Sequence, residues 1–208
     1  MQLFISTGLN KRFTTSELIN KFKKINIKNI ELSSGLYERD IFQKLKKIKE
    51  TNFLLHNYFP VPKHPFTINL ASKNNIIVNR SLKHLKRSIL YSSKLNIKYF
   101  SFHAGYLVDP KIEELGKVIT KQVVNERKDI LKLFIKRLNL FSKYAKNKGV
   151  MILLENNVVT KKNLNRFNKN PFLMTTFNET KKIMLSTDDN IKLLIDVGHL
   201  KVTAKTLK

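Results

Sequence analysis

The chain has no cysteine and no tryptophan, and only six glycines and five prolines among its 208 residues. Without cysteine it can form neither a disulfide nor a thiolate metal site, so any metal ion must be bound by histidine, aspartate or glutamate. No Gly/Pro/Ser-rich linker interrupts the sequence, and its composition does not change along the chain. We therefore expect one domain, residues 1–208.

Long apolar runs are also missing. Hydrophobic residues make up 42% of the chain, enough for a globular core, but no run approaches the ~20 residues needed to cross a bilayer. Residues 1–13 lack the basic leader, long apolar centre and small-residue cleavage site of a signal peptide. We expect a cytoplasmic protein without membrane contact.

Acidic residues are scarce, with 15 Asp and Glu against 40 Lys and Arg, which gives a net charge of +25. Such a charge can serve nucleic-acid binding, which requires basic residues clustered on one face. Here the lysines fall on the polar faces of several predicted helices, and Lys, Asn and Ile are abundant throughout, as an AT-rich coding bias produces. A solvated exterior is favoured, and nucleic acid is the less favoured partner.

Short apolar runs alternate with helical periodicity along the chain. The runs show little polar alternation, as expected of strands buried on both faces. Predicted strands are residues 3–6, 29–32, 53–56, 99–103, 151–156 and 193–196. Predicted helices are residues 14–25, 38–50, 80–95, 126–149 and 177–186.

Strict β-α alternation predicts an α/β fold with a parallel sheet, either doubly wound or a TIM barrel. A doubly wound nucleotide-binding sheet usually has a Gly-rich turn after its first strand, whereas residues 6–13 contain one glycine. The TIM-type (β/α) barrel is therefore favoured. Because eight units need about 250 residues and about six are visible, we expect an incomplete barrel that lacks the last two units.

Ionisable residues end several of the apolar runs. These are Glu31, His56, His103, Glu155 and Asp196, and His199 follows the last run after an expected tight turn at Val197–Gly198. In a parallel barrel the C-terminal strand ends meet at one mouth, where catalytic residues lie. A buried charge is tolerated there when it is paired or binds a metal.

Each of these residues also has a simpler explanation. A single strand-end histidine such as His56 is as often a hydrogen-bonded structural residue, and Glu31 can equally belong to a salt bridge. The convergence of several such groups from different strands favours a site. Imidazole and carboxylate together suit Zn²⁺, Mn²⁺ or Fe²⁺.

Three motifs resemble the xylose-isomerase-like TIM barrels. They are H-A-G at residues 103–105, L-L-E-N-N at residues 153–157 and L-I-D-V-G-H at residues 194–199. The superfamily contains metal-dependent sugar and sugar-phosphate isomerases and epimerases, and also metal-dependent apurinic-site endonucleases. Its seventh-strand histidine and eighth-strand glutamate have no counterpart here. This departure favours a fragment or an interrupted reading frame over a chain that a partner completes.

The resemblance implies a divalent metal ion (Mn, Zn, Mg or Co) bound by Glu155, Asp196 and His199. It also implies Glu155 and His199 as catalytic residues of an isomerase or epimerase of carbohydrate metabolism. His56, His103, Glu31 and Asn156 would then bind the sugar or sugar phosphate. The basic segment of residues 160–170, expected to be a loop at the mouth, could receive a phosphate.

Two other functions remain open. One is an endonuclease that repairs abasic DNA, favoured by the charge and by His56 and His103. Against it, position 104 is alanine where the endonucleases typically have proline. The other is an inactive, truncated barrel.

Overall fold

The computed structural model describes residues 2–10 and 12–208. Six strands form one parallel sheet in the order β1-β2-β3-β4-β5-β6, which confirms the predicted fold. The strands are β1 Ile5–Ser6, β2 Asn29–Leu32, β3 Asn52–His56, β4 Tyr99–His103, β5 Met151–Glu155 and β6 Ile191–Leu194.

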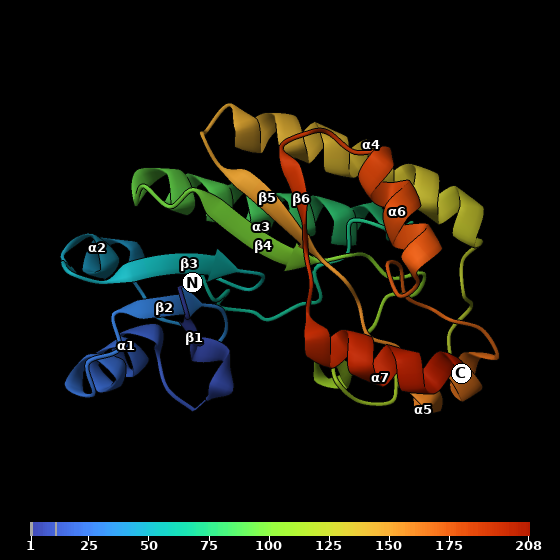
Figure 1. Cartoon of the computed structure of the whole chain (residues 1–208), viewed down its shortest axis with the longest axis horizontal. Coiled ribbons are helices and arrows are strands. Elements are labelled where there is room, and N and C mark those ends of the chain that lie inside the picture. Colours follow the sequence, from blue (N-terminus) through green and yellow to red (C-terminus); the bar gives the residue numbers. More distant parts are fainter. Residues whose placement is uncertain (1, 11) are drawn as a thin grey trace.

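Helices connect the strands, so that each strand returns to the sheet in the same direction. They are α1 Thr15–Lys24, α2 Ile41–Lys46, α3 Asn75–Lys94, α4 Arg127–Lys146, α5 Lys161–Phe167 and α6 Phe177–Leu185, with 3-10 turns at Thr7–Leu9 and Ile112–Glu114. A further helix, α7 Val197–Leu207, follows β6. In Figure 1, α1 and α2 lie beside β1–β3, and α3, α4 and α6 lie beside β4–β6. None of the helices in the described ranges is long and apolar enough to cross a membrane.

The main core lies between the sheet and its covering helices. Phe100 and Phe102 of β4 are almost fully buried, as are Phe134 and Phe141 of α4. The rings of Phe102 and Phe141 meet edge to face, with centroids 5.9 Å apart. These contacts fix the middle strands, whose C-terminal ends carry most of the site.

A second, smaller core lies beyond the strand ends, between the segment that follows β4 and the segment that follows β5. Its members are Tyr106, Val108, Ile119, Val159, Phe167 and Phe172. Asn163 of α5 adds two hydrogen bonds, accepting from the Ile119 N–H at 2.9 Å and donating to the Lys117 carbonyl at 3.0 Å. The long β4–α4 segment is thereby held in a defined position over the mouth of the sheet.

The edges of the sheet are more exposed than its centre. Ile5 of β1 is 36% exposed and Leu193 of β6 is 39% exposed. Within residues 2–10 and 12–208 the pairing runs from β1 to β6 and no pair joins these two strands. The sheet is therefore open, and the C-terminal ends of its six parallel strands lie on one side.

Two expectations about local structure were wrong. Residues 161–167 of the basic segment form helix α5 and not a loop, because the Thr160 side chain caps the Asn163 N–H. Val197 and Gly198 form the first turn of α7 and not a tight turn, and β6 ends at Leu194, before Asp196. Asp196 is the N-cap of α7, where a carboxylate satisfies an otherwise unpaired backbone N–H.

Candidate metal and substrate site

The C-terminal ends of the strands bring the ionisable residues together around a cavity of about 320 Å³. Register explains the convergence: His103, the last residue of β4, lies opposite Glu155, the last residue of β5. His56 ends β3 opposite Ser101. The cavity is lined by Ser6, Glu31, Ser33, His56, His103, Glu155, Leu194, Ile195, Asp196 and His199.

Glu155 is the centre of this cluster and is only 4% exposed. Its Oε1 lies 3.7 Å from Nδ1 of His103 and 3.6 Å from Nδ1 of His199. Its Oε2 lies 3.6 Å from Nδ1 of His56. Three imidazole rings thus surround one buried carboxyl group at distances longer than a direct hydrogen bond.

Asp196 and His199 are positioned by the first turn of α7. Oδ1 of Asp196 accepts a hydrogen bond of 2.8 Å from the His199 backbone N–H, which is the helix cap. The other oxygen, Oδ2, lies 3.7 Å from Nε2 of His199. One carboxylate therefore both begins the helix and faces the imidazole that the helix carries.

Asn156 holds this turn against the end of β5. Its side-chain Oδ1 accepts from the Asp196 N–H at 2.7 Å, and its Nδ2 donates to the Asp196 carbonyl at 3.3 Å. Its backbone carbonyl lies 2.8 Å from Nδ1 of His199. Because a carbonyl only accepts, Nδ1 must carry the proton, which leaves the lone pair of His199 on Nε2, beside Asp196.

The electrostatics of the cluster disfavour charge on the groups at its centre. Burial, the negative charge of Asp196 and that of Glu31 raise the pKa of Glu155 to about 8. Burial, helped by His56 and His199, holds the pKa of His103 well below its usual range. Burial also lowers the pKa of His56. At neutral pH the rings of His56 and His103 are therefore neutral, and they face a carboxyl group that only a nearby cation would keep ionised.

The donor set fits a divalent metal ion. His56, His103 and Glu155 form one group, and Glu155, Asp196 and His199 form a second, with donor atoms within 4.8 Å of one another in each. Ligands of a tetrahedral ion with bonds of about 2.1 Å lie about 3.4 Å apart. The 3.7 Å between Oδ2 of Asp196 and Nε2 of His199, and the 3.6–3.7 Å from Glu155 to Nδ1 of His56 and of His103, therefore need little adjustment. Nδ1 of His103 is buried without a hydrogen-bond partner among the described residues. An unpaired buried nitrogen beside a carboxyl group is typical of a metal site.

Two of the residues predicted for the site, Glu31 and Asn156, are placed differently from the strand-end residues. Glu31 lines the cavity from β2, but it lies at the third position of that strand and not at its end. The Asn156 side chain is 4% exposed and bonds both backbone groups of Asp196. The predicted substrate contact of Asn156 gains no support from this geometry. Ser6 and Ser33, which line the cavity, and Ser101, whose hydroxyl lies 2.8 Å from Nδ1 of His56, were not predicted. A serine in or after an apolar run carries no distinctive sequence signal.

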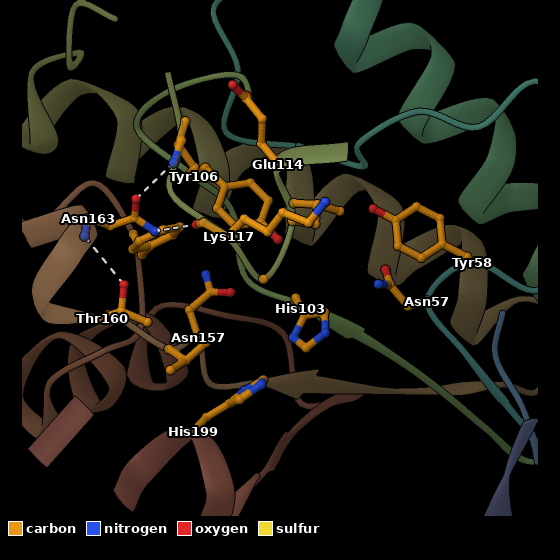
Figure 2. A pocket seen from close by; sticks show the side chains of 15 residues that line it. Asn57, Tyr58, His103, Tyr106, Glu114, Lys117, Asn157, Thr160, Asn163 and His199 are labelled. Atoms are coloured by element: carbon orange, nitrogen blue, oxygen red, sulfur yellow. Dashed lines mark hydrogen bonds between the residues drawn. The ribbon is translucent and has the colours of Figure 1, made fainter. Parts of the chain in front are cut away.

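A second cavity, of about 340 Å³, adjoins the first, and His103 and His199 line both. Its other walls come from the loop after β3, the β4–α4 segment and the segment around α5 (Figure 2). Tyr58, Tyr106 and Lys117 on these walls were not predicted. They lie in loops, where no periodic pattern marks a functional side chain.

Comparisons with known proteins agree with this architecture. The family model described as "Xylose isomerase-like TIM barrel" matches residues 19–205. Among curated protein sequences none matches the chain.

Solved structures with the same fold include a D-tagatose 3-epimerase-like protein, with 20% identity, a TM-score of 0.70 and coverage of 96% of this chain and 66% of that one. An L-ribulose 3-epimerase shows 18% identity, a TM-score of 0.68 and coverage of 96% and 62%. The IolI protein with a bound zinc atom shows 16% identity, a TM-score of 0.63 and coverage of 96% and 64%.

This chain thus spans just under two-thirds of the length of these structures, and at such identities the likeness establishes the fold alone. The family match covers most of the sequence, and the parallel sheet in sequential order agrees with it. The chain belongs to the xylose isomerase-like TIM barrel family.

Proposed function

We propose that the cluster binds a divalent metal ion through Glu155, Asp196 and His199 and acts as a sugar isomerase or epimerase. The observation that carries the proposal is the buried Glu155 carboxyl, which three imidazole nitrogens surround at 3.6–3.7 Å. Sugar epimerases among the structures of the same fold, and one with bound zinc, support this choice. The metal is one of Mn, Zn, Mg or Co.

A bound divalent cation would polarise the carbonyl group of the sugar and so acidify the neighbouring C–H. We assign the proton transfer to Glu155, because its two oxygens face different neighbours and one carboxyl can bind an ion and hold a proton. The proton leaves carbon for the carboxylate, and the electron pair moves to the carbonyl oxygen. Return of this proton by Glu155 to the former carbonyl carbon, with transfer of the neighbouring hydroxyl proton to the former carbonyl oxygen, gives an isomer. An epimer forms when a second acid, for which solvent water suffices, delivers a proton to the opposite face of the first carbon while Glu155 keeps the proton that it removed.

The histidines have a different part in this proposal. Lowered pKa values keep His56 and His103 neutral. Nδ1 of His56 lies 2.8 Å from the Ser101 hydroxyl and Nδ1 of His103 is buried, so Nε2 is the nitrogen that each ring can offer to a sugar hydroxyl. His199 presents its Nε2 lone pair to the cation beside Asp196, and Glu31 adds an acceptor at the cavity wall. Asn156 is best assigned as a positioning residue, because it fixes both Asp196 and the His199 ring.

The test is solvent exchange at carbon. The metal-loaded protein is incubated in D₂O with a panel of ketoses, and deuterium uptake at the carbon beside the carbonyl is measured by mass spectrometry. We expect uptake with the native chain and loss of at least 100-fold in Glu155→Gln, since acid–base groups contribute about 10²–10⁴-fold. Glu113→Gln makes the same charge change at an exposed residue outside both cavities and should retain uptake. No exchange with any ketose would refute the proposal.

One observation favours a second function. The two potential metal groups share Glu155, as in two-metal sites that hydrolyse phosphodiesters. Cleavage of duplex DNA at a single abasic position by the metal-loaded chain would establish the endonuclease and replace the sugar enzyme.

A further inference from the structure

The second cavity extends the site beyond the cavity around Glu155. The two cavities share His103 and His199, and the volume of the second, about 340 Å³, is that of a small-ligand pocket. A sugar whose reacting carbon lay at Glu155 would therefore extend its remaining carbons into this space. The side chains on its walls decide which group at the far end of the sugar is accepted.

Asn157 offers an acceptor to this cavity. Its Nδ2 donates to three backbone carbonyls, those of Ala104 at 2.9 Å, Gly105 at 3.1 Å and Leu173 at 3.0 Å. These bonds fix the orientation of the amide, so its oxygen faces the pocket (Figure 2). The residue is 4% exposed, and among the described residues no hydrogen bond to this oxygen is formed. An unpaired acceptor on the wall of a cavity suits a sugar hydroxyl.

Lys117 brings a positive charge to the same cavity. It is the only lysine or arginine among the described residues of the lining. Its backbone is fixed on both sides, since its N–H donates to the Glu114 carbonyl at 2.9 Å and its carbonyl accepts from Asn163 at 3.0 Å. In Figure 2 the Lys117 side chain and the Tyr58 hydroxyl point toward one another across the cavity.

Glu114 does not cancel this charge, although it belongs to the same lining. One carboxylate oxygen accepts from the Lys111 N–H at 2.8 Å, and the other accepts from the Thr120 N–H at 2.9 Å and from the Thr120 hydroxyl. Figure 2 shows the carboxylate directed away from the cavity. The Glu114 carboxylate therefore forms its hydrogen bonds within the β4–α4 segment, and Lys117 remains available to bind a ligand.

We propose that the second cavity binds the end of the sugar remote from the reacting carbon, and that Lys117 there binds an anionic group, a phosphate or a carboxylate. The inference rests on the proposed function for the reacting end, and it deepens that function from sugars in general to anionic sugars. It places the anion contact in the β4–α4 segment. The basic residues Lys161, Lys162 and Arg166 of α5 lie outside the lining.

The experiment compares three probes that differ only at the terminal carbon: D-glucose, D-glucose 6-phosphate and D-glucuronate. Dissociation constants are measured by ligand-observed NMR on the full chain at ~0.15 M salt, where long-range attraction to the net positive charge is screened. Each titration is made with and without Zn²⁺. The variants are Lys117→Met and Lys121→Met, of which the second removes the same charge from an exposed residue outside the cavity.

We expect at least one anionic probe to bind the native chain about 5–10-fold more tightly than glucose, as one charge-assisted hydrogen bond at an exposed lysine allows. Lys117→Met should abolish this preference and Lys121→Met should keep it. Equal binding of all three probes would overturn the inference, as would equal losses in both variants. Failure of the chain to bind Zn²⁺ refutes the metal site alone, because the metal-free titrations still decide the role of Lys117.

Discussion

Replacement of Asn156 by alanine should weaken metal binding although Asn156 is not itself a ligand. The change removes two hydrogen bonds that hold Asp196, of 2.7 and 3.3 Å, in a position 4% exposed. Loss of the partner of a buried backbone group costs about 1–3 kcal/mol, and these groups are partly buried, so we expect the free energy of unfolding to fall by about 1–2 kcal/mol. The Asp196 carboxylate should also lose its fixed orientation, whereas the Asn156 backbone carbonyl, which the variant retains, still accepts from the His199 ring.

Outer partners of metal ligands typically contribute 10–100-fold to metal affinity. We therefore expect Asn156→Ala to raise the dissociation constant for Zn²⁺ or Mn²⁺ by about 10–100-fold, measured by calorimetric titration. Unfolding of the metal-free protein in urea gives the change in stability separately.

Asn163→Ala is the matched control. Asn163 is also 4% exposed and also makes two hydrogen bonds to backbone groups, of 2.9 and 3.0 Å, but these groups belong to Ile119 and Lys117. The free energy of unfolding of this variant should fall by a similar amount. Its dissociation constant for the metal should stay within about 2-fold of the native value, since the hydrogen-bond partners of Asn163 are not proposed metal ligands. Equal losses of metal affinity in the two variants would refute the positioning role of Asn156.

Three further predictions concern charge. Glu155→Gln should stabilise the metal-free protein at pH 7 by on the order of 2 kcal/mol: the folded pKa of about 8 lies above the ordinary 4.5, so the native carboxyl destabilises the fold increasingly as pH rises from 4.5 to 8. Urea unfolding at several pH values checks this, and an unchanged or lower stability would contradict it. Burial lowers the pKa of His84 from 6.5 to about 4, so the contribution of His84 to stability should be constant above pH 6.5 and fall by up to about 3 kcal/mol as pH falls toward 4. His84→Gln should remove this contribution alone, so the stability difference between variant and native chain should change across this pH range, and a constant difference would contradict the prediction. Duplex DNA should be released near ~0.15 M salt without preference for an abasic position, and selective binding that persists there would favour the endonuclease.

The sheet could be predicted because strands buried on both faces are continuous apolar runs, and the alternation with helices allows few topologies. The convergence of His56, His103 and Glu155 followed from the same topology, since parallel strands end on one side. Helix α7 was missed because residues 193–197 resemble a strand, although the spacing of Asp196 and the His199 N–H is that of a helix cap.

Helix α5 was missed for a different reason. Its seven residues offer little apolar periodicity, and the helix is stabilised by the Thr160 cap, the hydrogen bonds of Asn163 and the packing of Phe167 into the smaller core. The position of Lys117 could not be predicted from the sequence either, because it depends on a hydrogen bond from Asn163, 46 residues away along the chain. Contacts of this kind between loops follow no local rule.

Binding of one divalent metal ion by Glu155, Asp196 and His199 is tested most directly by an anomalous difference map from crystals of the full chain soaked in Zn²⁺ or Mn²⁺. We expect a single strong peak at bonding distance, about 2.0–2.3 Å, from a carboxylate oxygen of Glu155, Oδ2 of Asp196 and Nε2 of His199. A map without a peak at saturating metal, or with a peak that Glu155 does not contact, would contradict it.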